Sequence, residues 1–234
     1  MMELKESYGW SEETNKLTDG YKYLGKYDTN DNITFSESYS WSTEINDWIE
    51  ESKSICEYDS KGRTTLEERY NWSKESNDWV GFLKEAKDYD SNGNEILNER
   101  YTWYSKNREW ILTGKVIKEF NSKNQETLVE SYNWSSSESK LVGYLKYIND
   151  YDSEGRKILE EQYNWSTELN NWKGNSKTVR AYDGYNEVLY EWYTWSTGTN
   201  NWLGISKDVS EYSDNSYTKI VYNWSTTDND WVLD

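Results

Sequence analysis

"RYNWSKESNDWVG", residues 69–81, places Trp72 and Trp79 seven residues apart on either side of a polar, loop-like centre. Near copies of this stretch recur along the whole chain of 234 residues. Successive first tryptophans are 31 residues apart five times, then 30 and 29, at Trp10, Trp41, Trp72, Trp103, Trp134, Trp165, Trp195 and Trp224. A period of this size is typical of repeat proteins, in which each unit stacks on its neighbours.

Three further positions recur with the first tryptophan. A second tryptophan follows seven residues later at Trp48, Trp79, Trp110, Trp172, Trp202 and Trp231, while Leu17 and Leu141 fill the two remaining slots. A glutamate stands four residues before the first tryptophan at Glu6, Glu37, Glu68, Glu99, Glu130, Glu161 and Glu191. A lysine stands twelve residues after it at Lys22, Lys53, Lys84, Lys115, Lys146, Lys177 and Lys207. We therefore divide residues 1–234 as a single array into units 1–31, 32–62, 63–93, 94–124, 125–155, 156–186, 187–216 and 217–234.

Each unit has the pattern of a β-hairpin. "TLEERYNWS" (65–73) alternates two sets of side chains with the period of a strand, and "WVGFLKEAKDY" (79–89) is a second strand. "YDSKGR" (58–63) between units is typical of a type I turn closed by a left-handed glycine. The loop between the two tryptophans carries an asparagine two residues before the second one in six of eight units, and asparagine tolerates the left-handed conformation that ends a four-residue loop.

The hairpin loop and the recurring charges favour two different strand registers. The loop favours Ser73 opposite Asp78 and Trp72 opposite Trp79, which sets Tyr70 against Gly81 and leaves room for the tyrosine ring. A shift by one residue would instead pair Glu68 with Lys84, Leu66 with Ala86 and Tyr70 with Phe82. We prefer the first register, although it leaves the joint recurrence of glutamate and lysine unexplained; a one-residue slip moves every side chain to the other face.

Consecutive hairpins predict an all-β fold, an antiparallel meander of about 15–16 strands. Open twisted sheets rarely exceed about 10 strands without curling. We therefore expect the array to coil into a spiral or to close into a barrel-like shape.

Composition excludes several classes of function. The chain has 26 basic and 43 acidic residues, a net charge of −17, and no histidine. Such an acidic surface repels phosphate backbones, so we expect no nucleic-acid partner. The absence of histidine excludes a histidine-based triad, general base or metal site. No apolar run approaches the ~18 residues of a membrane helix, and we expect no membrane insertion.

The turns Tyr58 to Arg63 and Tyr151 to Arg156 resemble those of YD-repeat proteins. The full 31-residue unit, with "YDSNGN" at 89–94 and "NDWVG" at 77–81, resembles the Trp-rich tandem arrays of secreted or surface bacterial proteins. This resemblance covers essentially the whole chain. It implies a β-rich spiral and an extracellular role, and those arrays offer no catalytic residues to transfer.

Two kinds of candidate site arise from the residues. Asp88, Asp90, Asn92, Gly93 and Glu99 match the spacing of a calcium loop, but they precede a strand and Glu99 belongs to the repeat, so we interpret the stretch as a hairpin turn without a metal. Rows of aromatic rings could instead bind a ligand, since large apolar surfaces left in water mark binding sites. The candidates are Trp41, Trp48, Trp72, Trp79, Trp103, Trp110, Trp165, Trp172, Trp192 and Trp202, of which only Trp192 lies outside the repeat.

We expect a non-enzymatic β-repeat scaffold, secreted or at the cell surface, with an elongated surface for adhesion or assembly and no cofactor. Its partners would be a polysaccharide, a surface protein or further copies of itself. A carbohydrate-binding module that uses exposed Trp and Tyr rows is the first alternative, and an intracellular structural repeat protein is the second.

Overall fold

The computed structural model describes residues 1–213 and 216–233, and all regular structure in them is β-strand. The strands are β1 (Met2–Ser11), β2 (Lys16–Tyr27), β3 (Ile33–Ser42), β4 (Asp47–Tyr58), β5 (Thr64–Ser73), β6 (Asp78–Tyr89), β7 (Glu95–Tyr104), β8 (Glu109–Phe120), β9 (Glu126–Ser135), β10 (Lys140–Tyr151), β11 (Lys157–Ser166), β12 (Asn171–Asp183), β13 (Asn186–Ser196), β14 (Asn201–Ser213), β15 (Ser216–Ser225) and β16 (Asp230–Leu233). The predicted meander of hairpins is confirmed.

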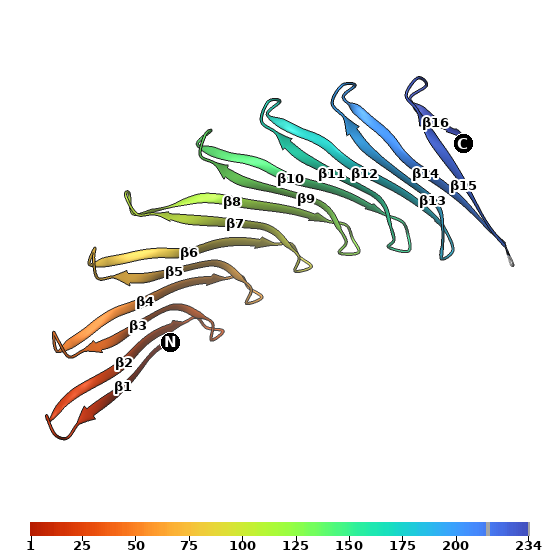
Figure 1. Cartoon of the computed structure of the whole chain (residues 1–234). Helices are drawn as coiled ribbons and strands as arrows, with labels where there is room; N and C mark the ends of the chain where they lie inside the picture. Colours follow the sequence, from red (N-terminus) through yellow and green to blue (C-terminus); the bar gives the residue numbers. More distant parts are fainter. Residues whose placement is uncertain (214–215, 234) are drawn as a thin grey trace. The chain divides into compact units, whose positions relative to one another are not determined.

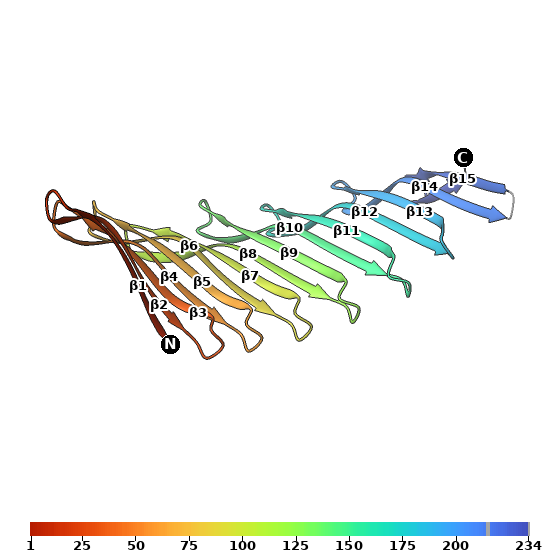
Figure 2. The same cartoon turned by 90° about the horizontal axis from the view of Figure 1, so that it is seen from below.

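The strands are hydrogen-bonded in chain order in a 16-stranded sheet, with β1 and β16 at the two ends of that order (Figure 1). Our expectation of a closed, barrel-like sheet is therefore wrong. The expected spiral is wrong as well, because the sheet is not strongly curled within either of the two units defined below (Figures 1 and 2). An antiparallel sheet can leave a face in water, and here no hydrophobic side chain of the described residues is fully buried on either face, so no core draws the sheet closed.

The chain forms two compact units. One consists of Met1–Tyr89 with Leu97–Lys115, and the other of Asp90–Ile96 with the residues from Val116 onward. The first holds β1–β6 with most of β7 and the first half of β8. The second holds the rest of β8 and β9–β16, and the same hairpin architecture is found in each unit.

The described residues form no conventional hydrophobic core. Among the described residues no hydrophobic side chain is fully buried, and the accessible surface of 14886 Å² exceeds the ~11,000 Å² expected for a compact protein of this mass. The hairpins are therefore held by cross-strand pairs and by contacts with the next hairpin, each of which stabilises the fold by about 0.2–1 kcal/mol.

Both registers that the sequence favours occur in one hairpin. In β5 and β6, Trp72 pairs with Trp79 and Tyr70 with Gly81 near the loop, while Glu68 pairs with Lys84 further along. The register shifts between these two regions because one residue, Phe82, has no partner on β5. Such a β-bulge adds one residue to one strand, and this turns the following side chains of β6 to the opposite face.

The same bulge recurs three residues after the position of the second tryptophan, which is Leu141 in one of these hairpins. The unpaired residues are Glu51, Phe82, Tyr144, Asn175 and Ile205. The hairpin of β1 and β2 differs, because its register shifts beside Trp10, next to the loop. The bulge therefore lets one face hold the tryptophan pair and the Glu–Lys pair together.

The loops adopt the predicted left-handed conformations. Asn77 has a φ of 49°, and the equivalent asparagines of five other loops have φ between 47° and 56°. Arg108 (59°) and Ser139 (52°) occupy the same position in the two loops without asparagine. Between hairpins, Gly62 has a φ of 78°, and its N–H donates a 3.0 Å hydrogen bond to the carbonyl oxygen of Asp59, as the type I turn requires.

Candidate functional site

Each hairpin presents two different faces. The aromatic face carries both tryptophans, the tyrosine, the glutamate and the lysine of the repeat, and the polar face carries the alternate residues. On the aromatic face, six tryptophan pairs lie edge to face with ring centroids 5.0–5.5 Å apart. Trp72 and Trp79 are one such pair, at 5.3 Å and 77°. This is a favourable geometry for two aromatic rings.

The tryptophan pair of one hairpin also packs on the hairpin before it. Trp103 and Trp110, on β7 and β8, lie 5.9 and 5.7 Å from the ring of Tyr70 on β5. The indole N–H of Trp110 donates a 3.0 Å hydrogen bond to the hydroxyl oxygen of Tyr70. In the other unit, Trp231 contacts Tyr193 in the same way, with a hydrogen bond of 3.1 Å. The aromatic clusters are thus contacts between neighbouring hairpins as well as closures of single ones.

Glycine makes these contacts possible. A Cβ atom on Gly81 would lie 2.4 Å from Trp110 Cζ2 and 2.8 Å from Trp103 Cε3, and Gly143, Gly174 and Gly204 are crowded in the same way by the next pair of tryptophans. We expected Gly81 to leave room for Tyr70. Tyr70 does pair with Gly81, but the space above the glycine is filled by the rings of the next hairpin.

A charged row runs beside the aromatic row. Lys84 Nζ lies 2.7 Å from Glu68 Oε1, and Tyr70 donates its hydroxyl hydrogen to the other carboxylate oxygen. The same ion pair joins Lys115 to Glu99, Lys146 to Glu130, Lys177 to Glu161 and Lys207 to Glu191. Partial burial would raise the pKa of Glu68, but the hydrogen bonds from Lys84 and Tyr70 hold it below its usual value. Partial burial, together with the hydrogen bond to Glu68, raises the pKa of Tyr70 to about 12.

The lysines reach forward to the next hairpin. Lys53 Nζ lies 4.7 Å from the ring centroids of both Tyr70 and Trp79, and Lys22 Nζ lies 4.3 Å from that of Tyr39. A cation in this position is attracted to the face of an aromatic ring. Desolvation by these neighbours lowers the pKa of Lys53. Lys84, Lys177 and Lys207 combine such a ring contact to the next hairpin with the ion pair inside their own hairpin.

The aspartates of the turns accept hydrogen bonds from backbone N–H groups of the same turn. Asp90 accepts hydrogen bonds from the N–H groups of Asn92, Gly93 and Asn94 at 2.8–2.9 Å, and from the Asn94 side chain at 2.8 Å. Glu99 contacts Lys115 and Tyr101. The hairpin-turn interpretation of residues 88–99 thus accounts for both carboxylates. Within the described ranges, no three Cys, Asp or Glu side chains gather as metal ligands would.

The candidate tryptophans fall into two groups. Nine of them are half-buried on the aromatic face, where they pack on one another: Trp41, Trp48, Trp72, Trp79, Trp103, Trp110, Trp165, Trp172 and Trp202. Trp192 differs, because it lies on the polar face and is 41% exposed. The structure therefore does not bring Trp192 together with the other nine.

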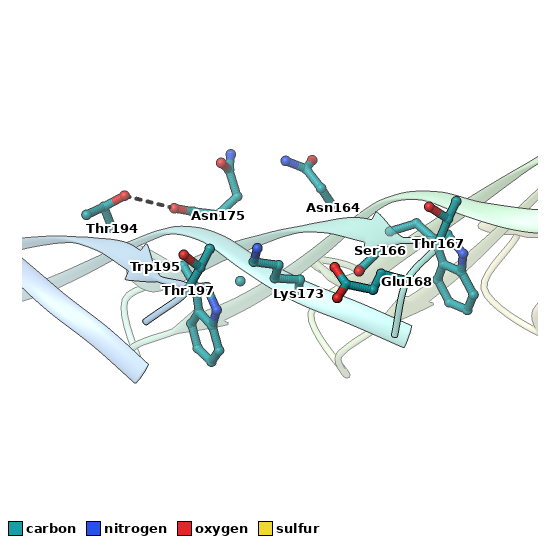
Figure 3. A pocket seen from close by; sticks show the side chains of 11 residues that line it. Asn164, Ser166, Thr167, Glu168, Lys173, Asn175, Thr194, Trp195 and Thr197 are labelled. Atoms are coloured by element: carbon teal, nitrogen blue, oxygen red, sulfur yellow. Dashed lines mark hydrogen bonds between the residues drawn. The ribbon is translucent and has the colours of Figure 1, made fainter. Parts of the chain in front are cut away.

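The polar face contains hydroxyl and amide groups. Ser36 and Ser38 of β3 make hydrogen bonds of 2.7 and 2.6 Å with Ser54 and Ser52 of β4. Near the ends of β11–β13, an open hollow of about 480 Å³ is lined by polar groups that include Asn164, Asn175 and Thr194, with Glu168 and Lys173 beside them. These three side chains point to one side of the ribbon and the ring of Trp195 to the other (Figure 3). Sequence reasoning missed this hollow, because its residues come from different repeats.

No family model matches the chain, and no curated protein matches it. Solved structures of Bacteroides proteins are similar to parts or all of it. A protein of unknown function from Bacteroides fragilis has 16% identity and a TM-score of 0.38 over 55% of this chain and 91% of its own. A DUF3836 family protein from Bacteroides vulgatus has 14% identity and a TM-score of 0.31 over 44% of this chain and 96% of its own. A porin-like protein from Bacteroides uniformis has 10% identity and a TM-score of 0.19 over 96% of this chain and 96% of its own. At these TM-scores the likenesses carry no argument about function.

The described residues contain no helix with the length and apolarity to span a membrane.

Proposed function

We propose that this chain is a non-enzymatic β-repeat scaffold whose repeated surface serves adhesion or assembly, at the bacterial cell surface or outside the cell. One observation carries the proposal: the contact between a tryptophan pair and the tyrosine and glycine of the preceding hairpin recurs within each unit. Such a nearest-neighbour contact can be repeated without limit, and this is how solenoid proteins build extended binding surfaces.

The distribution of polar groups supports the same proposal. The charged and phenolic groups of the aromatic face, such as Glu68, Lys84 and Tyr70, are engaged with each other in the five hairpins from β5 to β14. An active site would need a distinctive constellation held within about 0.5 Å. Identical, mutually satisfied groups favour a structural role over catalysis. Likeness to the secreted Trp-rich arrays supports the proposed location.

The carbohydrate-binding alternative, with the aromatic rows as its site, has weaker support. A sugar ring stacks on a ring face that is free, whereas Trp72, Trp79 and their equivalents lie edge to face with each other and against the next hairpin. The nine half-buried tryptophans therefore serve the proposed scaffold as its packing. The second alternative, an intracellular structural repeat protein, would use the same contacts.

Excision of residues 63–93 tests the scaffold. The deletion removes one full repeat and lets Trp103 and Trp110 take the place of Trp72 and Trp79 beside Lys53, so we expect a folded, shorter β-protein. A multivalent scaffold would lose surface adhesion gradually, since its repeated sites act through number and effective concentration. Circular dichroism and adhesion of whole cells that display each variant are the measurements. An unfolded product would contradict modularity, and an abrupt loss of adhesion by a folded product would contradict a shared, repeated surface.

A further inference from the structure

Trp192 departs from the repeat on the polar face. The position three residues before the first tryptophan is polar in six other hairpins, at Ser7, Ser38, Arg69, Arg100, Ser131 and Gln162, and is Val221 in the last. Trp192 occupies this position in β13 and is 41% exposed. A large, partly exposed indole thus stands where six other hairpins carry a polar residue, and an exposed ring that can also donate a hydrogen bond is suited to bind a ligand.

The two residues directly opposite Trp192 are uncharged and can form hydrogen bonds, while Arg180 and Asp208 lie opposite Tyr190, two residues along the same face. The cross-strand neighbours of Trp192 are Thr178 on β12 and Ser206 on β14. Thr194 lies two residues along the same strand and therefore on the same face, about 6.7 Å away. Thr194 lines the hollow described above, and its hydroxyl donates a 3.5 Å hydrogen bond to the carbonyl oxygen of Asn175 (Figure 3).

The hollow is also lined by Glu168 and Lys173, whose charges are opposite, and by two amide side chains. Asn164 and Asn175 are both exposed, both line the hollow, and both project to the side of the ribbon on which Thr194 lies (Figure 3). Each amide offers two N–H donors and one carbonyl acceptor, and each hydroxyl offers one donor and two lone pairs. An exposed aromatic ring is thus bordered by groups that can both donate and accept.

We propose that Trp192, Asn164, Asn175 and Thr194 form a binding site for a neutral oligosaccharide. One sugar ring would stack its C–H face on the indole, and the next would place its hydroxyls in the hollow against the asparagines and threonine. Sites for small molecules combine an apolar contact with a few placed polar groups in this way. The net charge of −17 disfavours anionic polysaccharides and nucleic acids. A single exposed ring is also far smaller than the ~1,000 Å² that a stable protein interface buries.

Isothermal titration calorimetry of the full chain tests this site with four neutral probes: cellohexaose, laminarihexaose, mannohexaose and chitohexaose. We expect at least one of them to bind with a Kd near or below about 1 mM, an affinity that calorimetry can resolve. Trp192→Ser restores the residue of Ser38 and Ser131 and should weaken binding by about tenfold or more, while Trp192→Tyr keeps a ring and should retain most of it.

The matched control is Trp134→Leu, because Trp134 is 39% exposed but lies on the aromatic face. It should leave binding unchanged. No binding of any probe at about 1 mM, unchanged binding by Trp192→Ser, or equal loss in Trp134→Leu would each overturn the proposal. Should Trp192→Ser unfold, Asn175→Ala at an exposed position gives the same comparison. Excision of residues 63–93 leaves every residue of this site in place. The experiments therefore distinguish a failure of the proposed binding site from a failure of the proposed scaffold.

Discussion

The indole N–H of Trp110 donates a 3.0 Å hydrogen bond to the hydroxyl oxygen of Tyr70, which lies 40 residues earlier in the chain and one hairpin away. The same phenol donates its own hydrogen to Glu68, which also binds Lys84. One side chain therefore joins the aromatic row to the charged row and one repeat to the next. Removal of this phenol should therefore destabilise two hairpins at once.

Trp72 and Trp79 should show direct coupling in a double-mutant cycle. Their rings lie edge to face at 5.3 Å, so each single alanine substitution should destabilise the protein, and the double variant should lose less than the sum by about 0.5–1.5 kcal/mol. Urea denaturation measures the three variants. Strictly additive losses would rule out direct pairing of the two rings.

Gly81→Ala should destabilise the fold by roughly 1–3 kcal/mol, because the new methyl group would overlap the ring of Trp110 at 2.4 Å and force the next hairpin aside. Gly198→Ala is the control, since the nearest atom to a Cβ there is 3.9 Å away. Chemical denaturation of both variants gives the comparison. Equal stabilities would mean that the tryptophan pair can shift without cost.

Ser139→Asn should stabilise the protein by about half a kcal/mol, because Ser139 has a φ of 52° and asparagine tolerates the left-handed region better than serine. Asn77→Ser is the reverse change in an equivalent loop, where φ is 49°, and should destabilise by a similar amount. Shifts of the urea midpoint in the same direction for both variants would contradict this account.

The tyrosines of the charged row should make the fold sensitive to alkali. Partial burial and a neighbouring glutamate raise the pKa to about 12 in Tyr70, Tyr101, Tyr132 and Tyr193. An unfolded tyrosine titrates near 10. The folded state therefore binds these protons more tightly, so its stability is fully present below pH ~10 and is lost as the pH rises toward 12.

Parallel titrations by phenolate absorbance and by circular dichroism check this prediction. The late-ionising tyrosines and the loss of β-structure should share one midpoint above pH ~10. Tyr70→Phe should reduce the number of late phenols by one and shift that midpoint. Unfolding that is complete before any phenol ionises would show that other groups control it.

Much of a single hairpin could be predicted from the sequence. The pairs Trp72–Trp79 and Ser73–Asp78 follow from loop length and from the asparagine at residue 77, and the structure confirms both. The Glu68–Lys84 pair, which we gave to a competing register, is also present. The two registers can occur in one hairpin only if β6 contains one extra residue between them. Phe82, whose ring is 55% exposed, is that extra residue. No feature of the sequence around Phe82 sets it apart from the paired residues, so the sequence analysis missed the bulge.

Contacts between hairpins were harder to predict, since the periodicity shows that units repeat but not which side chains meet across them. The role of Gly81 depends on Trp103 and Trp110, which are more than twenty residues away, and nothing local to the glycine indicates them. The polar hollow combines Asn164, Asn175 and Thr194 from adjacent repeats for the same reason.

The lack of a buried hydrophobic core has a calorimetric consequence. The heat-capacity change of unfolding arises mainly from apolar surface that becomes hydrated, and typical domains reach about 12–15 cal/mol/K per residue. Here no hydrophobic side chain in the described part of the chain is fully buried before unfolding begins. Scanning calorimetry should therefore give a smaller value per residue, and the free energy of unfolding should vary with temperature along a flatter curve. Such a protein would lose little stability in the cold, where compact domains are weakened.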